Sequence, residues 1–183
     1  MFLVFESNAK EIKIKKKNNL TLIQNVKSYG VSLDQNKNIY IPDFKNNLVF
    51  VIDDYHKKIN TLENNKNILI SNPHSIAFLK KKLILVNLGK KDQNGNIILI
   101  NEKGNNYKII KNFYKNKSFK KPASIFVDQN NLIYISDVFE NKILIFNEEF
   151  SLLNWIGLLE QNMTDDFKKK NLFDIKLKNP HGI

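Results

Sequence analysis

The chain has 183 residues and carries 29 basic against 18 acidic side chains, which gives a formal net charge of +11. Its composition, 42% hydrophobic and 26% charged, excludes a disordered chain, and the absence of Cys excludes disulfides, thiolate catalysis and zinc sites built on Cys. All 29 basic residues are Lys, a bias that AT-rich codons explain, and the lack of Arg argues against sequence-specific nucleic-acid binding.

The N-terminal segment Phe2–Phe5 is apolar, but Glu6 and Lys10 interrupt it before the apolar core of a signal peptide is complete. Apolar runs elsewhere are a few residues long, far short of the roughly 20 that a membrane-spanning helix needs. We therefore expect a soluble chain without a signal peptide or a transmembrane segment, and the sequence leaves its compartment open.

The first predicted strands lie in this same N-terminal region. Phe2–Phe5, followed by Ile12 and Ile14, resembles Ile143–Phe146 and the apolar residues that come after it. We expect two strands here.

Residues 28–53 and 122–147 are two copies of one repeat, related by a constant offset of 94 residues. The identities occur without a gap, which chance does not explain. The identical positions are Asp34, Gln35, Asn36, Ile39, Tyr40, Ile41, Asp43 and Asn47, each with its partner 94 residues later.

A third copy lies between these two, from Pro73 through a Lys-rich hairpin to Asn87, and a fourth begins at Asn179. Repeats of this length are typical of propellers and solenoids. Equivalent positions at Gly30, Ser75, Ser124 and Gly182 give spacings of 45, 49 and 58 residues.

Each copy is predicted to form four short strands. The apolar runs are rich in Ile, Val, Tyr and Phe and are separated by Asn, Asp and Lys turns, which favours antiparallel hairpins over helices. One helical turn is predicted near Asp165–Lys170, in an insertion after the last strand. The strands predicted for the best copy are Ser124–Val127, Leu132–Ile135, Ile143–Phe146 and Leu152–Ile156.

Four such strands in series make one propeller blade. The predicted fold class is therefore all-β, a β-propeller of four-stranded antiparallel blades, with about three and a half blades in a single partial domain over residues 1–183. Because the strands at the two ends do not complete one blade, we expect a fragment that is truncated at least at Ile183. The expected parts are a blade remnant at 1–27, blades at about 28–72, 73–121 and 122–178, and the start of the next blade at 179–183.

Pro122–Asp128, Leu132–Asp137 and Asn141–Phe146 resemble the NHL repeat, whose consensus runs Pro-x-Gly-Ile-x-Val-Asp, Ile-Tyr-Val-x-Asp and Asn-x-Arg-Ile-x-x-Phe. The resemblance covers nearly the whole chain and implies a six-bladed propeller in the parent protein. Proteins of this fold include RNA-binding and protein-binding modules, sensor domains, the peptidyl-hydroxyglycine amidating lyase and gluconolactonase-like hydrolases. The resemblance therefore implies a fold and no single activity.

Propellers usually bind ligands at the mouth of the central channel, where the innermost strands begin. These positions are Tyr29, His74, Ala123 and His181, and we take Tyr29, His74 and His181 as the candidate ligand-binding residues. His74 and His181 stand in equivalent Asn-Pro-His segments, and converging imidazoles suit a cation such as zinc. The resemblance supports this, since the amidating lyase carries its metal-binding His in a similar opening. In the alternative interpretation, each His packs beside Pro and hydrogen-bonds a backbone carbonyl.

Asp43, Asn87 and Asp137 end the second strand of successive copies, and Asn47 and Asn141 follow the two Asp after four residues. A short acceptor can bind the backbone N–H groups of a turn, and Asn tolerates left-handed backbone dihedrals. We therefore predict a repeated turn structure here rather than a catalytic site.

Two functions of different classes remain. The favoured one is a non-catalytic binding or scaffold propeller that presents channel-mouth and loop surfaces to a protein, peptide or glycan; one such loop is the Gly157–Lys178 insertion, with Trp155 at its base. It requires no cofactor. The alternative is a metal-dependent lyase or hydrolase, similar to the amidating lyase, in which His74 and His181 hold a divalent cation, zinc or calcium. It needs a further inward His, Glu or Asp, and the sequence identifies no catalytic residue. A Lys-rich face for single-stranded RNA is a third, weaker interpretation.

Overall fold

The computed structural model describes residues 3–4, 11–15, 20–24, 26–53, 59–65, 68–101 and 107–182. These residues form β-strands and one short helix, α1, at Asp165–Lys168. The strands are β1 Leu3–Val4, β2 Glu11–Lys15, β3 Leu20–Gln24, β4 Ser32–Leu33, β5 Ile39–Asp43, β6 Leu48–Ile52, β7 Ile59–Leu62, β8 Pro73–Leu79, β9 Lys82–Asn87, β10 Asn96–Ile100, β11 Tyr107–Ile110, β12 Asn112–Tyr114, β13 Lys117–Ser118, β14 Pro122–Val127, β15 Ile133–Asp137, β16 Lys142–Phe146, β17 Leu152–Ile156 and β18 Asn171–Phe173.

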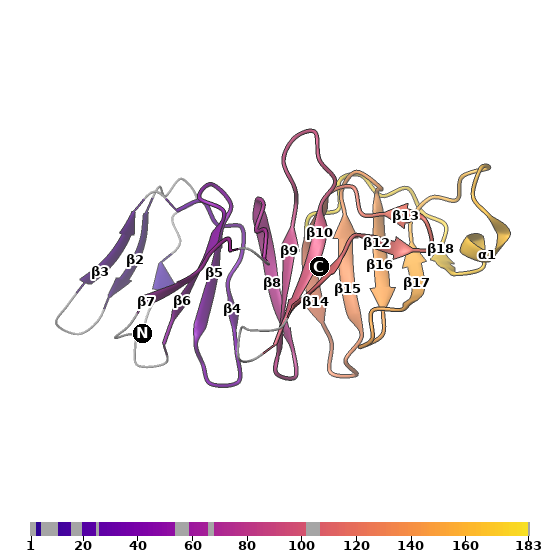
Figure 1. Ribbon diagram of the computed structural model, residues 1–183. Coiled ribbons are helices and arrows are strands. Elements are labelled where there is room, and N and C mark those ends of the chain that lie inside the picture. Colours follow the sequence, from indigo (N-terminus) through magenta and orange to yellow (C-terminus); the bar gives the residue numbers. More distant parts are fainter. Residues whose placement is uncertain are drawn as a thin grey trace.

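Three sheets share one plan, in which four antiparallel strands follow one another in chain order. We call them the first blade (β4–β7), the second blade (β8–β11) and the third blade (β14–β17). Figure 1 shows them side by side, from indigo through magenta to orange, and β8 contacts both β5 and β14. The four-stranded antiparallel sheets that the sequence predicts are therefore confirmed, and the helical turn falls where it was expected.

The hairpins close on non-glycine residues in the left-handed backbone region. The turn of the β4–β5 hairpin contains Lys37 at φ 61°, that of β8–β9 contains Lys80 at φ 54°, and that of β14–β15 contains Asn131 at φ 62°. These turns are short, so each strand lies directly beside its successor. The first and third blades share the same five-residue turn, which reflects the repeat in the sequence, whereas the β8–β9 hairpin turns over Lys80 and Lys81 alone.

The core lies between the blades, and β9 shows why. Successive side chains of a strand point to opposite faces of the sheet. Leu83 and Leu85 of β9 belong to a cluster shared with the first blade, whereas Ile84 and Val86 belong to a cluster shared with the third blade. Because both of its faces are buried, β9 is a nearly continuous apolar run, Lys-Leu-Ile-Leu-Val-Asn, instead of an alternating one.

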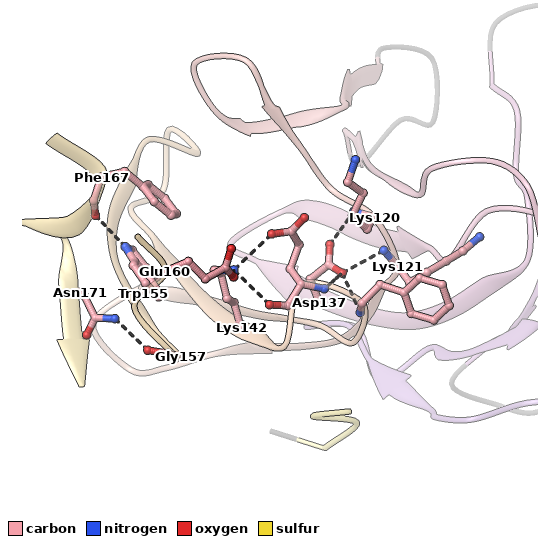
Figure 2. A network of polar contacts seen from close by, with 11 residues as sticks. Lys120, Lys121, Asp137, Lys142, Trp155, Gly157, Glu160, Phe167 and Asn171 are labelled. Carbon is pink, nitrogen blue, oxygen red and sulfur yellow. Dashed lines mark hydrogen bonds and ion pairs between the residues drawn. The ribbon is translucent and has the colours of Figure 1, made fainter. Parts of the chain in front are cut away.

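The buried Asp that ends the second strand connects the parts of each blade. The Oδ1 atom of Asp137 accepts the backbone N–H groups of Lys121 (2.9 Å), Phe139 (3.2 Å) and Glu140 (3.2 Å), and its Oδ2 atom accepts that of Lys120 (2.7 Å). Figure 2 shows these contacts between the β15–β16 turn and the segment before β14. Burial raises the pKa of Asp137 even though the backbone donors act in the opposite direction.

The same structure recurs in the other blades, as the repeated Asp and Asn predict. Asp43 accepts backbone N–H groups from Lys27 (3.3 Å) and from the β5–β6 turn, and Asn87 accepts that of Ser71 (3.3 Å). Asn47 and Asn141 adopt left-handed dihedrals, with φ 56° and 50°. Their Oδ1 atoms accept the N–H groups of Asn72 (2.7 Å) and Asn179 (3.0 Å), which open the following copies of the repeat.

The structure corrects the predicted strands in three places. The N-terminal sheet has the order β1–β2–β3, so that it contains three strands where the sequence predicted two. The insertion after β17 adds β18, which runs parallel to β17, and the segment before β14 folds into a β12–β13 hairpin. These strands are two to five residues long, and runs of two or three residues are too short to show a strand period. Within the described ranges, no helix has the length and apolar character that crossing a membrane requires.

Candidate binding site at the channel mouth

The three candidate residues come together where the innermost strands begin. Tyr29 precedes β4, His74 is the second residue of β8, and His181 lies in the segment that opens the fourth copy. The rings of Tyr29 and His74 are stacked, with centroids 4.3 Å apart and planes 8° apart. The rings of His74 and His181 are 6.0 Å apart and tilted by 36°. The copies that open at Tyr29, His74 and His181 thus contribute one ring each to a row, which we call the channel-mouth row, whereas the intervening copy has Ala123 at the equivalent position.

His74 is the fixed centre of this row. Its side chain is buried, and its Nδ1 atom lies 2.9 Å from the carbonyl oxygen of Ala123. A carbonyl only accepts, so Nδ1 carries the proton and donates it, and Nε2 is left as an acceptor in the neutral ring. Burial lowers the pKa of His74 although its hydrogen bond to Ala123 acts in the opposite direction, and electrostatic repulsion from the neighbouring His181 and Lys27 lowers it further, which favours the neutral ring at pH 7.

This hydrogen bond is the one that the structural interpretation of His74 requires. The acceptor, however, belongs to the third blade, so the bond also ties the openings of two blades together. Ala123 is fully buried and contributes its backbone rather than a side chain to the site. The bond leaves the second ring nitrogen unused, so it is compatible with either role that the sequence allows for His74.

The outer members of the row are accessible. Tyr29 is 53% exposed and His181 is exposed as well. The row therefore presents two aromatic rings to solvent on a buried, hydrogen-bonded support. Such rings supply contact area at a low cost in conformational entropy when they bind a ligand.

Two further residues complete the site, and the sequence analysis missed them. The Phe44 ring packs edge-on against Tyr29, with centroids 5.5 Å apart, and the Lys27 ammonium lies 5.4 Å from the centroids of both rings. Phe44 follows the repeated Asp43, at a position where the other copies have Leu88 and Val138. An aromatic residue in place of an aliphatic one was the signal available in the sequence.

The metal site expected at His74 and His181 would need further ligands. No group of three or more His, Cys, Asp or Glu lies close enough to hold a metal ion anywhere in the described ranges. A catalytic zinc ion usually takes three protein ligands and one water. His74 and His181 alone therefore do not fit a complete catalytic zinc site.

The Gly157–Lys178 insertion is docked on the third blade through Trp155 and exposes several apolar side chains. Trp155 at its base is fully buried: its ring stacks on Phe167 at 4.8 Å, and its Nε1–H donates to the Phe167 carbonyl at 2.8 Å. Figure 2 shows this pair, together with Lys142, which contacts Glu160 of the insertion at 3.4 Å. The exposed apolar side chains of the insertion are Leu158, Leu159, Leu172, Phe173 and Ile175.

No protein-family model matches the chain, and no curated protein matches it. Among solved structures, the virginiamycin B lyase from Staphylococcus aureus is similar, with a TM-score of 0.62 and 19% identity over 95% of this chain and 52% of that one. A streptogramin B lyase structure has a TM-score of 0.61 and 14% identity over 84% of this chain and 49% of that one. A nidogen/laminin complex has a TM-score of 0.56 and 12% identity over 80% of this chain and 55% of that one.

The chain spans about half the length of the solved structures that it matches. At these identities the likeness concerns the fold alone. The matches include lyases as well as a protein complex, so they do not separate catalysis from binding. By fold, the chain is part of a β-propeller.

Proposed function

We propose that this chain is part of a non-catalytic binding propeller with NHL-like repeats, which holds a protein, peptide or glycan partner at the channel mouth. The observation that carries the proposal is the channel-mouth row, in which accessible Tyr29 and His181 flank the buried and hydrogen-bonded His74. A rigid aromatic platform that is fixed on one side and open on the other is typical of residues that dominate a binding interface.

The arrangement favours binding over catalysis on chemical grounds. His74 donates Nδ1–H to Ala123 and is stacked on Tyr29, so its position is set by packing. The nearest cation, Lys27, lies over the faces of Tyr29 and Phe44. In the described part of the chain, neither the His74 nor the His181 ring forms a hydrogen bond with an Asp or Glu side chain, which a catalytic imidazole commonly uses for orientation.

The test places a photoreactive benzoylphenylalanine at position 29 in the cells that make the protein and identifies the cross-linked partner by mass spectrometry. The affinity of that partner is then measured for Tyr29→Ala, His181→Ala and the control Phe126→Ala, whose side chain is exposed to a similar extent, 50%. We expect the first two variants to weaken binding by at least about 10-fold and the control by less than about 2-fold. Equal affinities in all variants would contradict the proposal.

A metal-dependent lyase or hydrolase is the second candidate, and the spacing of the two imidazoles favours it. Two imidazoles bound to one tetrahedral zinc at the usual distances have ring centres roughly 5 Å apart, and those of His74 and His181 are 6.0 Å apart. The neutral His74 ring also has Nε2 available as a ligand atom. This function needs a third protein ligand besides these two, as noted above.

Elemental analysis of the purified protein and of His74→Ala separates the two candidates. About one zinc or calcium ion per chain, lost in the variant, would favour the enzyme. A protein that holds no metal after dialysis against zinc, or metal that His74→Ala leaves in place, would remove the second candidate and leave the first.

A further inference from the structure

A groove lies between the first and second blades, at the end of the strands opposite to the channel mouth. Tyr29 and His74 lie where β4 and β8 begin, whereas the groove is lined by the β4–β5 and β8–β9 hairpins, which turn together at the lower edge of Figure 1. Its volume is about 590 Å³, within the range of small-molecule sites. It is therefore a separate site from the channel-mouth row.

The floor of the groove is aromatic and aliphatic. Tyr40 of the first blade and Phe78 of the second blade meet edge to face, with ring centroids 4.8 Å apart and planes 63° apart, and Leu83 lies beside them. The strand pairings make Ile84 the equivalent of Tyr40 at the next junction between blades, because Ile84 pairs with Ala77 as Tyr40 pairs with Ser32. Ile84 is fully buried there. The Tyr40–Phe78 pair is thus absent from the next junction, although Tyr40 itself recurs in the third blade as Tyr134, whose hydroxyl donates to Asp128.

The ring of Tyr40 is held in place. Its hydroxyl donates to Asp34 Oδ2 at 3.2 Å, and Asp34 Oδ1 accepts the N–H groups of Asn36 (2.9 Å) and Asn38 (2.8 Å). Burial and the charge of Asp34 raise the pKa of Tyr40 to about 12, so the hydroxyl remains protonated and keeps donating. Both oxygens of the Asp34 carboxylate are engaged by these donors.

The rim of the groove is polar and carries charges of both signs. Its lining contains Lys80, Lys81 and Asp34, and Lys80 forms an ion pair with Glu148, which lies outside the lining. The other polar groups are mostly side-chain amides, each of which can both donate and accept hydrogen bonds. The amides of the rim belong to Gln35, Asn36, Asn38, Asn60 and Asn101.

We propose that this groove binds a neutral oligosaccharide. A pyranose ring has an apolar face of C–H groups, which packs on an aromatic ring such as Tyr40 or Phe78, and an edge of hydroxyl groups, which pair with amides that donate and accept. Because Asp34 and two Lys share this rim and Lys80 is already paired with Glu148, the rim does not present a single charge sign to an ionic ligand. The volume accommodates two to three sugar rings, at roughly 200 Å³ for each, in a pocket of ordinary ligand size.

The probes are chitotetraose, maltotetraose, cellotetraose and mannotetraose, titrated into the full 183-residue chain and followed by NMR chemical shifts and by calorimetry. We expect one of them to bind with a Kd below about 1 mM. Phe78→Ala, which removes an aromatic face, should weaken it by at least about 10-fold, and Asn36→Ala, which removes a rim amide, by about 3-fold to 10-fold.

Each variant has a matched control in the third blade. Asn130 is the exposed equivalent of Asn36, and its N–H donates to Asp128 as that of Asn36 does to Asp34; Phe126 is an exposed aromatic on β14. Asn130→Ala and Phe126→Ala should leave the affinity within about 2-fold. Asn36 is itself exposed, so the Asn36/Asn130 comparison decides the matter even where Phe78→Ala fails to fold.

Three results would overturn the proposal. One is the absence of saturable binding by any of the four saccharides up to about 10 mM. Another is binding that neither Phe78→Ala nor Asn36→Ala weakens. The last is binding of the capped tripeptide acetyl-Ala-Phe-Ala-amide with shifts at Tyr40 and Phe78 while no saccharide binds, which would make the groove a peptide site. None of these results bears on the channel-mouth row, because its residues do not line the groove.

Discussion

Substitution of Asp137 by Ala tests whether the repeated buried carboxylate holds each blade together. The side chain is fully buried and accepts four backbone N–H groups, two from the segment before β14 and two from the β15–β16 turn. Ala offers no acceptor to any of them. The substitution therefore disconnects the first and second strands of the third blade at their shared end.

The expected cost follows from the same contacts. At about 1 kcal/mol for each hydrogen bond, the loss of four of them destabilises the fold by about 4 kcal/mol. Removal of a buried carboxylate, whose pKa burial raises, returns part of this free energy. We therefore expect the free energy of unfolding to fall by about 3 kcal/mol, which most domains tolerate without unfolding.

Urea denaturation followed by Trp155 fluorescence measures this loss, because Trp155 is the only Trp and is fully buried in the same blade. The control is Asp128→Ala, which removes the same charge and two backbone hydrogen bonds of 2.8 Å, but in a turn that water reaches. It should cost about 1 kcal/mol. A loss for Asp137→Ala no larger than that for Asp128→Ala would refute the reasoning. If Asp137→Ala does not fold, Asp137→Asn, which keeps one oxygen, takes its place in the comparison.

Three other predictions rest on single contacts. Burial lowers the pKa of His74 in the folded protein, so below pH 6.5 the unfolded chain binds the proton more readily. The free energy of unfolding should therefore fall with falling pH, by at most about 1.4 kcal/mol per pH unit. Urea titrations at several pH values should show this slope in the wild type and not in His74→Gln. A Cβ at Gly95 would lie 2.4 Å from the Asn87 carbonyl oxygen, so Gly95→Ala should lower the free energy of unfolding by about 2 kcal/mol. Gly30→Ala, whose added Cβ would have nothing within 4 Å, should change it by less than about 0.5 kcal/mol. Comparable melting temperatures of the two variants would contradict this prediction. Phe167→Ala removes a fully buried ring that stacks on the indole of Trp155. It should lower the free energy of unfolding by about 3 kcal/mol and shift the fluorescence of the folded protein to longer wavelengths. An unchanged emission maximum would show that the insertion is not what shields the indole from water.

The repeat made most of the fold predictable. Once 28–53 and 122–147 are aligned, the strand pattern of one copy predicts the others, and the structure confirms it in β5, β9 and β15. The role of Asp43 and Asp137 was also predictable, because a short side chain that accepts hydrogen bonds at the start of a turn usually binds the backbone N–H groups of that turn. The strand β18 was missed because its three residues show no strand period and its parallel pairing with β17 depends on how the insertion folds, whereas β3 carries an apolar run, Leu20–Gln24, that could have been recognised.

The candidate residues Tyr29, His74 and His181 were identified from their equivalent places in the repeat. Their ring contacts and the bond from His74 to Ala123 were not predictable, because they depend on the angle between blades and join residues that lie 45 to 107 positions apart in the sequence. The same is true of Lys27 and Phe44, which reach the site through the backbone of the Asp43 turn.

Local properties of the sequence thus determined what each segment becomes: strands from short β-branched and aromatic runs, turns from Asn and Asp, and a repeat from identities at a fixed offset. The tertiary structure alone decided what meets across the blades, from the stacked Tyr29 and His74 to the Tyr40 and Phe78 floor of the groove. The physical reason is that strand periodicity assigns a side chain to a face of its own sheet, whereas the partner on the facing sheet depends on how the blades pack against each other.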